Sequence, residues 1–72
     1  MIMNYTVKKL YETRRKFELP RSIISRFLKV PETTIWRWEN SISEPSPNNL
    51  LAINKLVDAI SELQKDILNE KS

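Results

Sequence analysis

The chain has 72 residues and contains neither cysteine nor histidine, which excludes disulfide bridges, the usual zinc sites, thiol nucleophiles and imidazole bases. A chain of this length forms one domain, 1–72, near the lower size at which a single core is stable, so a partner subunit would help. The net charge is +3, but residues 1–38 carry nine Lys or Arg against three Glu, whereas residues 39–72 carry three against six acidic residues.

The basic N-terminal half predicts a partner that is a polyanion, because phosphate neutralisation releases counterions. The alternative for any one of Lys8, Lys9, Arg15 and Lys16 is that it only solvates a helix face. No apolar run approaches the roughly 18 residues of a membrane span, and the first residues lack the order of a signal peptide. We therefore expect a cytoplasmic protein that does not associate with membranes.

Three helices are predicted in the first 40 residues. The first covers about 4–17 and takes its apolar positions from Val7, Leu10, Tyr11 and Phe17. The second begins near Pro20 and ends near Leu28, and the third begins at Pro31 and ends near Asn40, since proline suits the first turn of a helix. Residues 41–45 are polar and predict a loop.

A long C-terminal helix over 46–69 is predicted next, with Ser46 as its cap and Pro47 as its first residue. A coiled-coil type seam with spacings of 3, 4, 3 and 4 runs along it, formed by Ile53, Leu56, Ile60, Leu63 and Ile67. Its first half should pack on the domain, while Ile60, Leu63 and Ile67 extend beyond so small a core and predict a homodimer surface. The alternatives are that the tail folds back onto Ile23 and Phe27, or that it frays.

Residues 19–40 predict two short amphipathic helices joined by a tight turn. Ile24 and Leu28 give the first helix an inward stripe, and Ile35 and Trp38 give one to the second. Steps of 100° place the opposite face of the second helix outward, where it is free to touch a partner. This outward face is formed by Glu32, Thr33, Trp36 and Arg37.

This segment resembles the helix-turn-helix of the phage repressor and Cro family, and the resemblance extends over about 10–56. The residues in register without a gap are Leu19, Ile24, Leu28, Val30, Thr34, Ile35, Trp38, Glu39, Glu44, Pro45, Ser46, Leu50 and Leu51. The resemblance implies an all-α fold, a lambda-repressor-like helix-turn-helix bundle of four to five helices, here with an extended C-terminal helix. The helix-turn-helix itself would cover 20–40.

Four positions depart from the family pattern. Lys29 replaces the turn glycine, and a non-glycine residue in the left-handed conformation costs roughly 1 kcal/mol. Arg21 replaces a glutamine and keeps a donor for phosphate. Ser25 replaces an alanine where the two helices cross closely, and Trp36 replaces a serine that faces DNA.

Base-reading positions carried over from the family are Glu32, Thr33, Trp36 and Arg37. Arg37 suits a bidentate contact to guanine, Glu32 suits a cytosine amino group, and Thr33 or Trp36 suits a thymine methyl group. For Glu32, stabilisation of the helix dipole by its carboxylate is as good an interpretation as base reading. For Trp36, the alternative to a groove contact is that it shields the turn. Arg37 has the alternative of a solvated charge.

Phosphate contacts and one internal ion pair are also implied by the resemblance. Arg21 would reach the DNA backbone, with Asn40 and Ser43 as secondary contacts. Arg14 and Glu39 occupy positions that form a largely buried ion pair in some family members, and such a pair would orient the reading helix.

The sequence therefore predicts a small transcriptional regulator that binds double-stranded DNA as a homodimer on a palindromic operator, without cofactor, metal or small-molecule ligand. The competing interpretation is an antitoxin-type module that binds a partner protein and regulates its own operon. An enzyme is disfavoured, because no nucleophile and base are recognisably paired.

Overall fold

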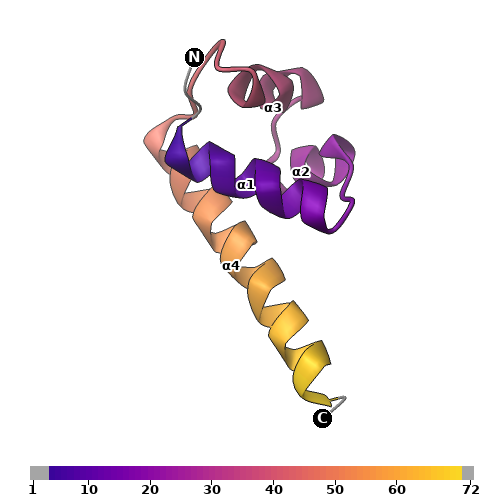
Figure 1. Cartoon of the computed structure of the whole chain (residues 1–72). Helices are drawn as coiled ribbons and strands as arrows, with labels where there is room; N and C mark the ends of the chain where they lie inside the picture. Colours follow the sequence, from indigo (N-terminus) through magenta and orange to yellow (C-terminus); the bar gives the residue numbers. More distant parts are fainter. Residues whose placement is uncertain (1–3, 71–72) are drawn as a thin grey trace.

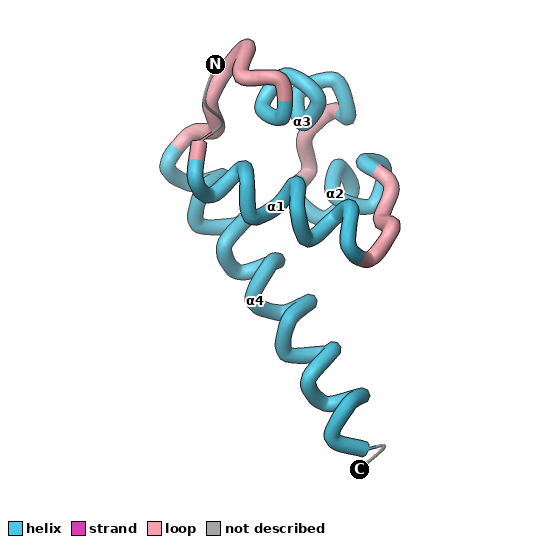
Figure 2. The backbone as a smooth tube through the Cα atoms, viewed as in Figure 1, coloured by secondary structure: helices cyan, strands magenta, loops and turns pink. Residues whose placement is uncertain are grey.

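The structure, a computed structural model, describes the backbone of residues 4–70 and the side chains of residues 4–65. These residues form α1 (Tyr5–Lys16), α2 (Arg21–Leu28), α3 (Glu32–Glu39) and α4 (Pro47–Glu70), and no strand occurs among them. Figures 1 and 2 show α1 lying across the first half of α4, with α2 and α3 beside and above it. The predicted all-α helix-turn-helix bundle is confirmed.

Capping side chains fix the starts of the longest helices. Asn4 Oδ1 accepts from the backbone N–H of Thr6 at 2.8 Å and of Val7 at 3.4 Å, which begins α1. Ser46 Oγ accepts from the backbone N–H of Asn49 at 3.3 Å ahead of Pro47, so the predicted start of α4 is confirmed. Both caps satisfy backbone donors that a helix cannot pair internally.

Helices α1, α2 and α3 end in the same backbone motif. A residue one or two positions past each end is left-handed: φ is 55° at Glu18, 59° at Lys29 and 60° at Ser41. The next residue then donates its N–H to the carbonyl five positions back, which defines a Schellman motif. These bonds are Leu19 to Arg14 at 2.8 Å, Val30 to Ser25 at 3.2 Å and Ile42 to Arg37 at 2.9 Å.

Glycine is the usual residue at such a position, yet this chain contains none. Each left-handed residue therefore keeps a Cβ that the conformation disfavours by roughly 1 kcal/mol. The positive φ predicted for Lys29 is confirmed, whereas sequence analysis did not anticipate the same geometry at Glu18 and Ser41.

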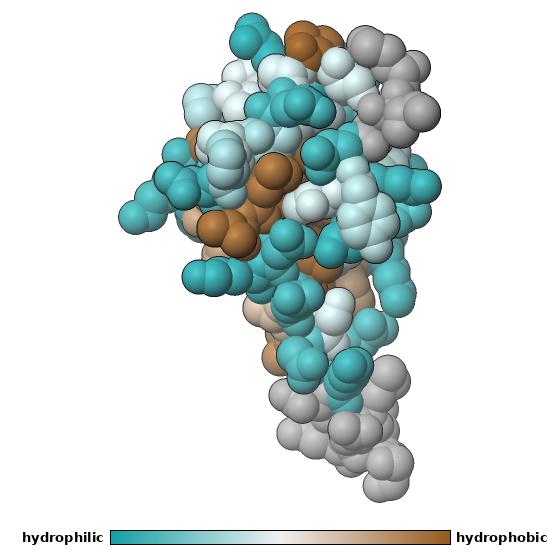
Figure 3. Space-filling view, turned by 90° about the vertical axis from the view of Figure 1, so that its left-hand side faces the viewer, coloured by the Kyte–Doolittle hydropathy of each residue, from teal (hydrophilic) through white to brown (hydrophobic). Residues whose placement is uncertain are grey.

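One apolar core joins all four helices. Its buried members are Val7, Leu10, Ile24, Leu28, Ile35, Trp38, Ile53, Leu56 and Val57. Val30 from the turn and Ile60 from α4 pack against its edge. Because Ile24 and Leu28 of α2 and Ile35 and Trp38 of α3 are buried in this core, the predicted inward stripes are confirmed. Tyr11 and Phe17, expected as apolar positions of α1, are only half-buried. Apolar side chains also reach the surface between polar ones, as the face in Figure 3 shows.

Helix α4 leaves the core about halfway along its length. It runs on as one uninterrupted helix to Glu70, which gives the molecule a long axis of 43 Å against 24 and 21 Å across (Figure 1). Leu63 is exposed, and Ile67 lies outside the residues whose side chains are described. Within residues 4–70, no helix combines the length and apolar character needed to cross a bilayer.

Replacing Lys29 by glycine tests the strained turn. We expect Lys29→Gly to leave the free energy of unfolding unchanged or to raise it by up to about 1 kcal/mol, because relief of the Cβ clash competes with greater freedom of the unfolded chain. Lys29→Ala retains the Cβ and should bring no gain. Thermal denaturation of the three proteins measures the difference, and clear destabilisation by glycine would contradict the left-handed geometry.

Candidate functional site

The turn between α2 and α3 is held by paired contacts between Ser25 and Val30. The Val30 N–H donates to the Ser25 carbonyl, and the Ser25 hydroxyl donates back to the Val30 carbonyl. The sequence indicated only that Ser25 is small where the helices cross. The structure adds that its hydroxyl closes the turn, so an alanine there would lose this bond.

The outward face of α3 is bare. Glu32, Thr33, Trp36 and Arg37 are all exposed, while Ile35 and Trp38 on the other side of the same helix are buried in the core. Among residues 4–65, the side chains of these four form no hydrogen bond or ion pair. The structure thus brings the four predicted base-reading residues together on one accessible ridge. We call this set the α3 ridge.

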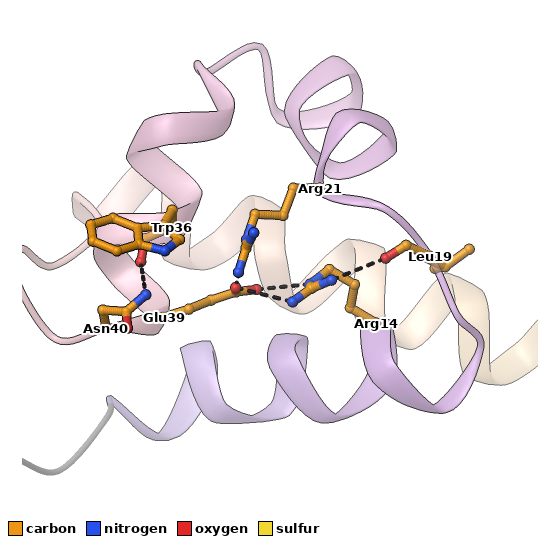
Figure 4. A network of polar contacts seen from close by, with 6 residues as sticks. All are labelled: Arg14, Leu19, Arg21, Trp36, Glu39 and Asn40. Atoms are coloured by element: carbon orange, nitrogen blue, oxygen red, sulfur yellow. Dashed lines mark hydrogen bonds and ion pairs between the residues drawn. The ribbon is translucent and has the colours of Figure 1, made fainter.

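A buried carboxylate fixes the position of α3. The Glu39 side chain is 2% exposed and lies between Arg14 of α1, at 11%, and Arg21 of α2, at 34%. Arg14 donates from Nε to Glu39 Oε2 at 2.9 Å and from Nη2 to Oε1 at 3.1 Å, and Arg21 donates from Nε to Oε1 at 2.8 Å. Figure 4 shows the two guanidinium groups converging on Glu39 from different helices.

This network places Arg14 and Glu39 in the contact that the resemblance implied, and it adds Arg21 to them. Arg14 also donates to the Leu19 carbonyl at 3.3 Å, which ties the end of α1 to the same point. Two cations against one carboxylate leave an excess positive charge. That excess lies with Arg21, the more exposed of the two arginines.

Arg21, predicted to bind phosphate, is therefore engaged within the protein through one nitrogen only. Its terminal Nη nitrogens donate to no described residue, and neither is among the buried unpaired atoms. Both terminal nitrogens thus keep contact with solvent while Nε holds the group in place. This geometry suits an arginine that is oriented by Glu39 before it meets an anion.

The two secondary phosphate positions differ in their surroundings. Asn40 is exposed and donates from Nδ2 to the Trp36 carbonyl at 2.8 Å, so its amide caps the end of α3 (Figure 4). Ser43 is exposed in the loop that follows, and no described residue forms a hydrogen bond with its hydroxyl. Both lie just beyond the C-terminal end of α3.

Basic side chains of α1 lie against aromatic rings of the same helix and of its C-cap residue, Phe17. Lys9 Nζ is 5.2 Å from the Tyr5 ring centre, and the Arg15 guanidinium is 5.8 Å from that of Tyr11. Lys16 lies 5.6 Å from the ring centre of Phe17. These cation–π contacts support the alternative that the basic residues of α1 serve its own surface.

No protein-family model, curated protein or solved structure matches the chain. The functional argument therefore rests on the α3 ridge and on the contacts that hold it. Among the described residues, no group of three His, Cys, Asp or Glu side chains could hold a metal ion.

Removing the Glu39 carboxylate should destabilise the fold far more than removing Arg21. We expect Glu39→Ala to lower the free energy of unfolding by about 3 kcal/mol, because Arg14 is left buried and unpaired. Arg21→Ala leaves Glu39 bonded to Arg14 and should lower it by only about 1 kcal/mol.

Urea unfolding followed by tryptophan fluorescence measures these losses, since Trp38 is buried in the core. Glu12→Ala removes an exposed carboxylate of α1 and is the matched control, with no measurable effect expected. Equal losses for Glu39→Ala and Glu12→Ala would contradict the structural role of the network.

Proposed function

We propose that this chain is a sequence-specific double-stranded DNA-binding protein, a small transcriptional regulator of the phage repressor and Cro type. The observation that carries the proposal is the α3 ridge, a bare helix face backed by the core and fixed by the Glu39 network. The major groove of B-DNA is about 12 Å wide and admits one α-helix, and base edges there carry a distinctive pattern of donors and acceptors.

The chemistry of the α3 ridge suits this groove. Arg37 offers the fork of N–H groups that pairs with guanine O6 and N7, and Glu32 offers acceptors to a cytosine amino group. Trp36 and Thr33 offer apolar surface to a thymine methyl group. Trp36 is exposed although it is a large aromatic residue, and contact with DNA would desolvate it.

Backbone contacts would set the register of α3 on the duplex. Arg21 holds accessible N–H groups beside the start of α2 and is restrained by Glu39, so it suits a phosphate oxygen. Asn40 and Ser43 would add weaker contacts past the end of α3. The excess of basic residues in the half of the chain that contains α2 and α3 favours the same partner.

Homodimerisation through α4 would place two α3 helices in successive major grooves, about 34 Å apart, on a roughly palindromic operator. Repression by promoter occlusion, controlled by protein concentration in the cytoplasm, needs no cofactor and no small-molecule ligand. Exposed Leu63 on α4 also suits the second candidate, an antitoxin-type module that binds another protein. A self-contained dimer of the purified chain would favour the regulator, and a requirement for a second protein would favour the module.

Selection of bound sites from random DNA, followed by binding assays on the selected site, tests the proposal. Arg37→Ala should lose discrimination at one operator position, at a cost of about 1–3 kcal/mol, because a base-specific contact is removed. Arg21→Ala should weaken binding to all sequences alike and reduce the slope of log K against log salt by about one unit.

Lys55→Ala is the matched control, since it removes an exposed positive charge from α4, away from the α3 ridge. It should leave affinity and discrimination unchanged. Failure to enrich any sequence would overturn the proposed function, and equal loss on every sequence for Arg37→Ala would refute the role given to Arg37.

A further inference from the structure

Two apolar patches on different helices remain uncovered in the structure. On α2, Ile23 is 48% and Phe27 is 55% exposed, four positions apart on the same side of the helix. On α4, Leu63 is 62% exposed, one turn past Ile60, the last residue of α4 that packs against the core. We call Ile23 and Phe27 the α2 patch, and the part of α4 after Ile60 the α4 tail.

No described residue of the same chain covers the α2 patch. Helix α4 continues as one helix to Glu70 and leads away from the bundle, so its tail does not fold back onto α2 (Figure 1). The alternative in which the tail folds back onto Ile23 and Phe27 is therefore absent from the structure. Phe27 and Leu63 both stay more than half exposed within one chain, although each is an apolar side chain whose burial is favourable.

We propose that the α4 tail of one copy packs on the α2 patch of a second copy, and that this contact occurs twice in a symmetric homodimer. In a two-fold symmetric dimer, contact of one copy's α4 tail with its partner's α2 patch is repeated by the partner's tail on the first copy's patch, which gives two equivalent contacts. The inference rests on the proposed homodimer and names the surface to which its α4 tail binds.

Charge favours this pairing over contact between two α4 tails. Residues 58–70 contain four acidic residues and one lysine, and Asp58, Glu62, Asp66 and Glu70 follow one another at intervals of four. Asp58 and Glu62, one turn apart, are both exposed on α4, so two tails side by side would bring like charges together. The α2 patch instead carries Arg26 between its two apolar residues in the sequence, and α2 contains no acidic residue.

Charged side chains beside the α2 patch and on the α4 tail also suit contact between them. Among the described side chains, Glu62 forms an ion pair only with Lys65, at 3.8 Å, and both are 70% exposed, so this pair is weak and open to exchange. Arg26 is exposed and forms no ion pair with any described residue. Steering of an acidic tail toward a basic helix also sets the register of the contact.

The contact leaves the α3 ridge accessible. Ser25 faces the turn before α3, where it bonds to Val30, whereas Ile23 and Phe27 share the opposite side of α2. In Figure 1 the α4 tail points away from α3. The α2 patch shares no residue with the α3 ridge, so a tail that packs on Ile23 and Phe27 need not cover the residues proposed to read DNA.

Complementary charge substitutions test the reciprocal contact without DNA. Phe27→Lys alone and Leu63→Glu alone should each raise the dimer dissociation constant by about a hundredfold, because each change acts at both contacts. An equimolar mixture of the two variants should recover a mixed dimer. In that dimer the introduced lysine of one variant faces the introduced glutamate of the other at one contact, while the second contact keeps the original Phe27 and Leu63.

Sedimentation equilibrium measures the masses, and circular dichroism confirms that each variant stays folded. Leu51→Glu is the matched control, because Leu51 is 63% exposed on another side of α4, and it should leave the dimer intact. The inference is overturned if Leu63→Glu breaks the dimer while Phe27→Lys does not, which indicates pairing between tails. It is also overturned if mixing restores nothing, or if the parent protein is a monomer.

The chain offers an independent check because it has no cysteine of its own. Under oxidising conditions, a mixture of Phe27→Cys and Leu63→Cys should form a mixed disulfide in preference to either homodimer, which mass spectrometry distinguishes. Preferential linkage of Leu63→Cys to itself would overturn the reciprocal contact. Because none of these measurements includes DNA, they can succeed even if the chain proves not to bind DNA.

Discussion

The position of α3 depends on one buried carboxylate. A helix of eight residues is not stable in isolation, so tertiary contacts must fix where α3 lies. Burial of Ile35 and Trp38 sets which side faces inward, but apolar packing is non-directional and leaves rotation and sliding less well defined. The Glu39 carboxylate supplies the direction, because it accepts from Arg14 of α1 and from Arg21 of α2 at once.

A buried carboxylate of this kind fixes the position of a helix but adds little to the net free energy of unfolding, compared with apolar packing of the same volume. Removing charges from water carries a large desolvation penalty, and their attraction recovers it only where every partner is in place. Three donated N–H groups satisfy Glu39, and the remaining charge is left to Arg21 near the surface. The same three residues thus fix the position of α3 inside the bundle and leave a positive charge near the surface that suits an anion.

The ends of the helices show a second constraint. In a chain without glycine, three Schellman motifs are held by Glu18, Lys29 and Ser41. At two of the three positions, contacts of the following residue hold the strained turn: the Leu19 carbonyl accepts from the Arg14 guanidinium, and Val30 packs against the core and bonds to Ser25. The short connections between helices are fixed by hydrogen bonding as well as by residue preference.

Much of this architecture could be predicted from local signals. Apolar spacing identified the inward stripes, Ser46 and Pro47 marked the start of α4, and alignment with a known turn indicated the positive φ of Lys29. Arg21 was assigned only to phosphate, because a contact across 18 residues depends on how α2 and α3 meet. Glu18 and Ser41 escaped prediction because neither residue type marks a helix end.

The periodic seam along α4 illustrates the limit of pattern alone. Ile53 and Leu56 are buried in the core of their own chain, Ile60 lies at its edge, and Leu63 is exposed, although all four share one spacing. Periodicity shows which side of a helix is apolar. How far the core of the same chain extends along the helix decides which of those apolar residues remain exposed. Because the core is built from so few residues, burial of the seam ends within α4, between Ile60 and Leu63.

Charge follows the same division of the molecule. The half of the chain that builds α1, α2 and nearly all of α3 carries the positive excess, and the half that contains α4 carries the negative one. Since the α4 tail points away from α3, the charge separation runs along the molecule (Figure 1). In the field of a polyanion, this distribution turns the α3 end toward the phosphates and the acidic tail away from them. The acidic tail would then disfavour binding in the reverse orientation, which supports specificity through repulsion as well as through contact.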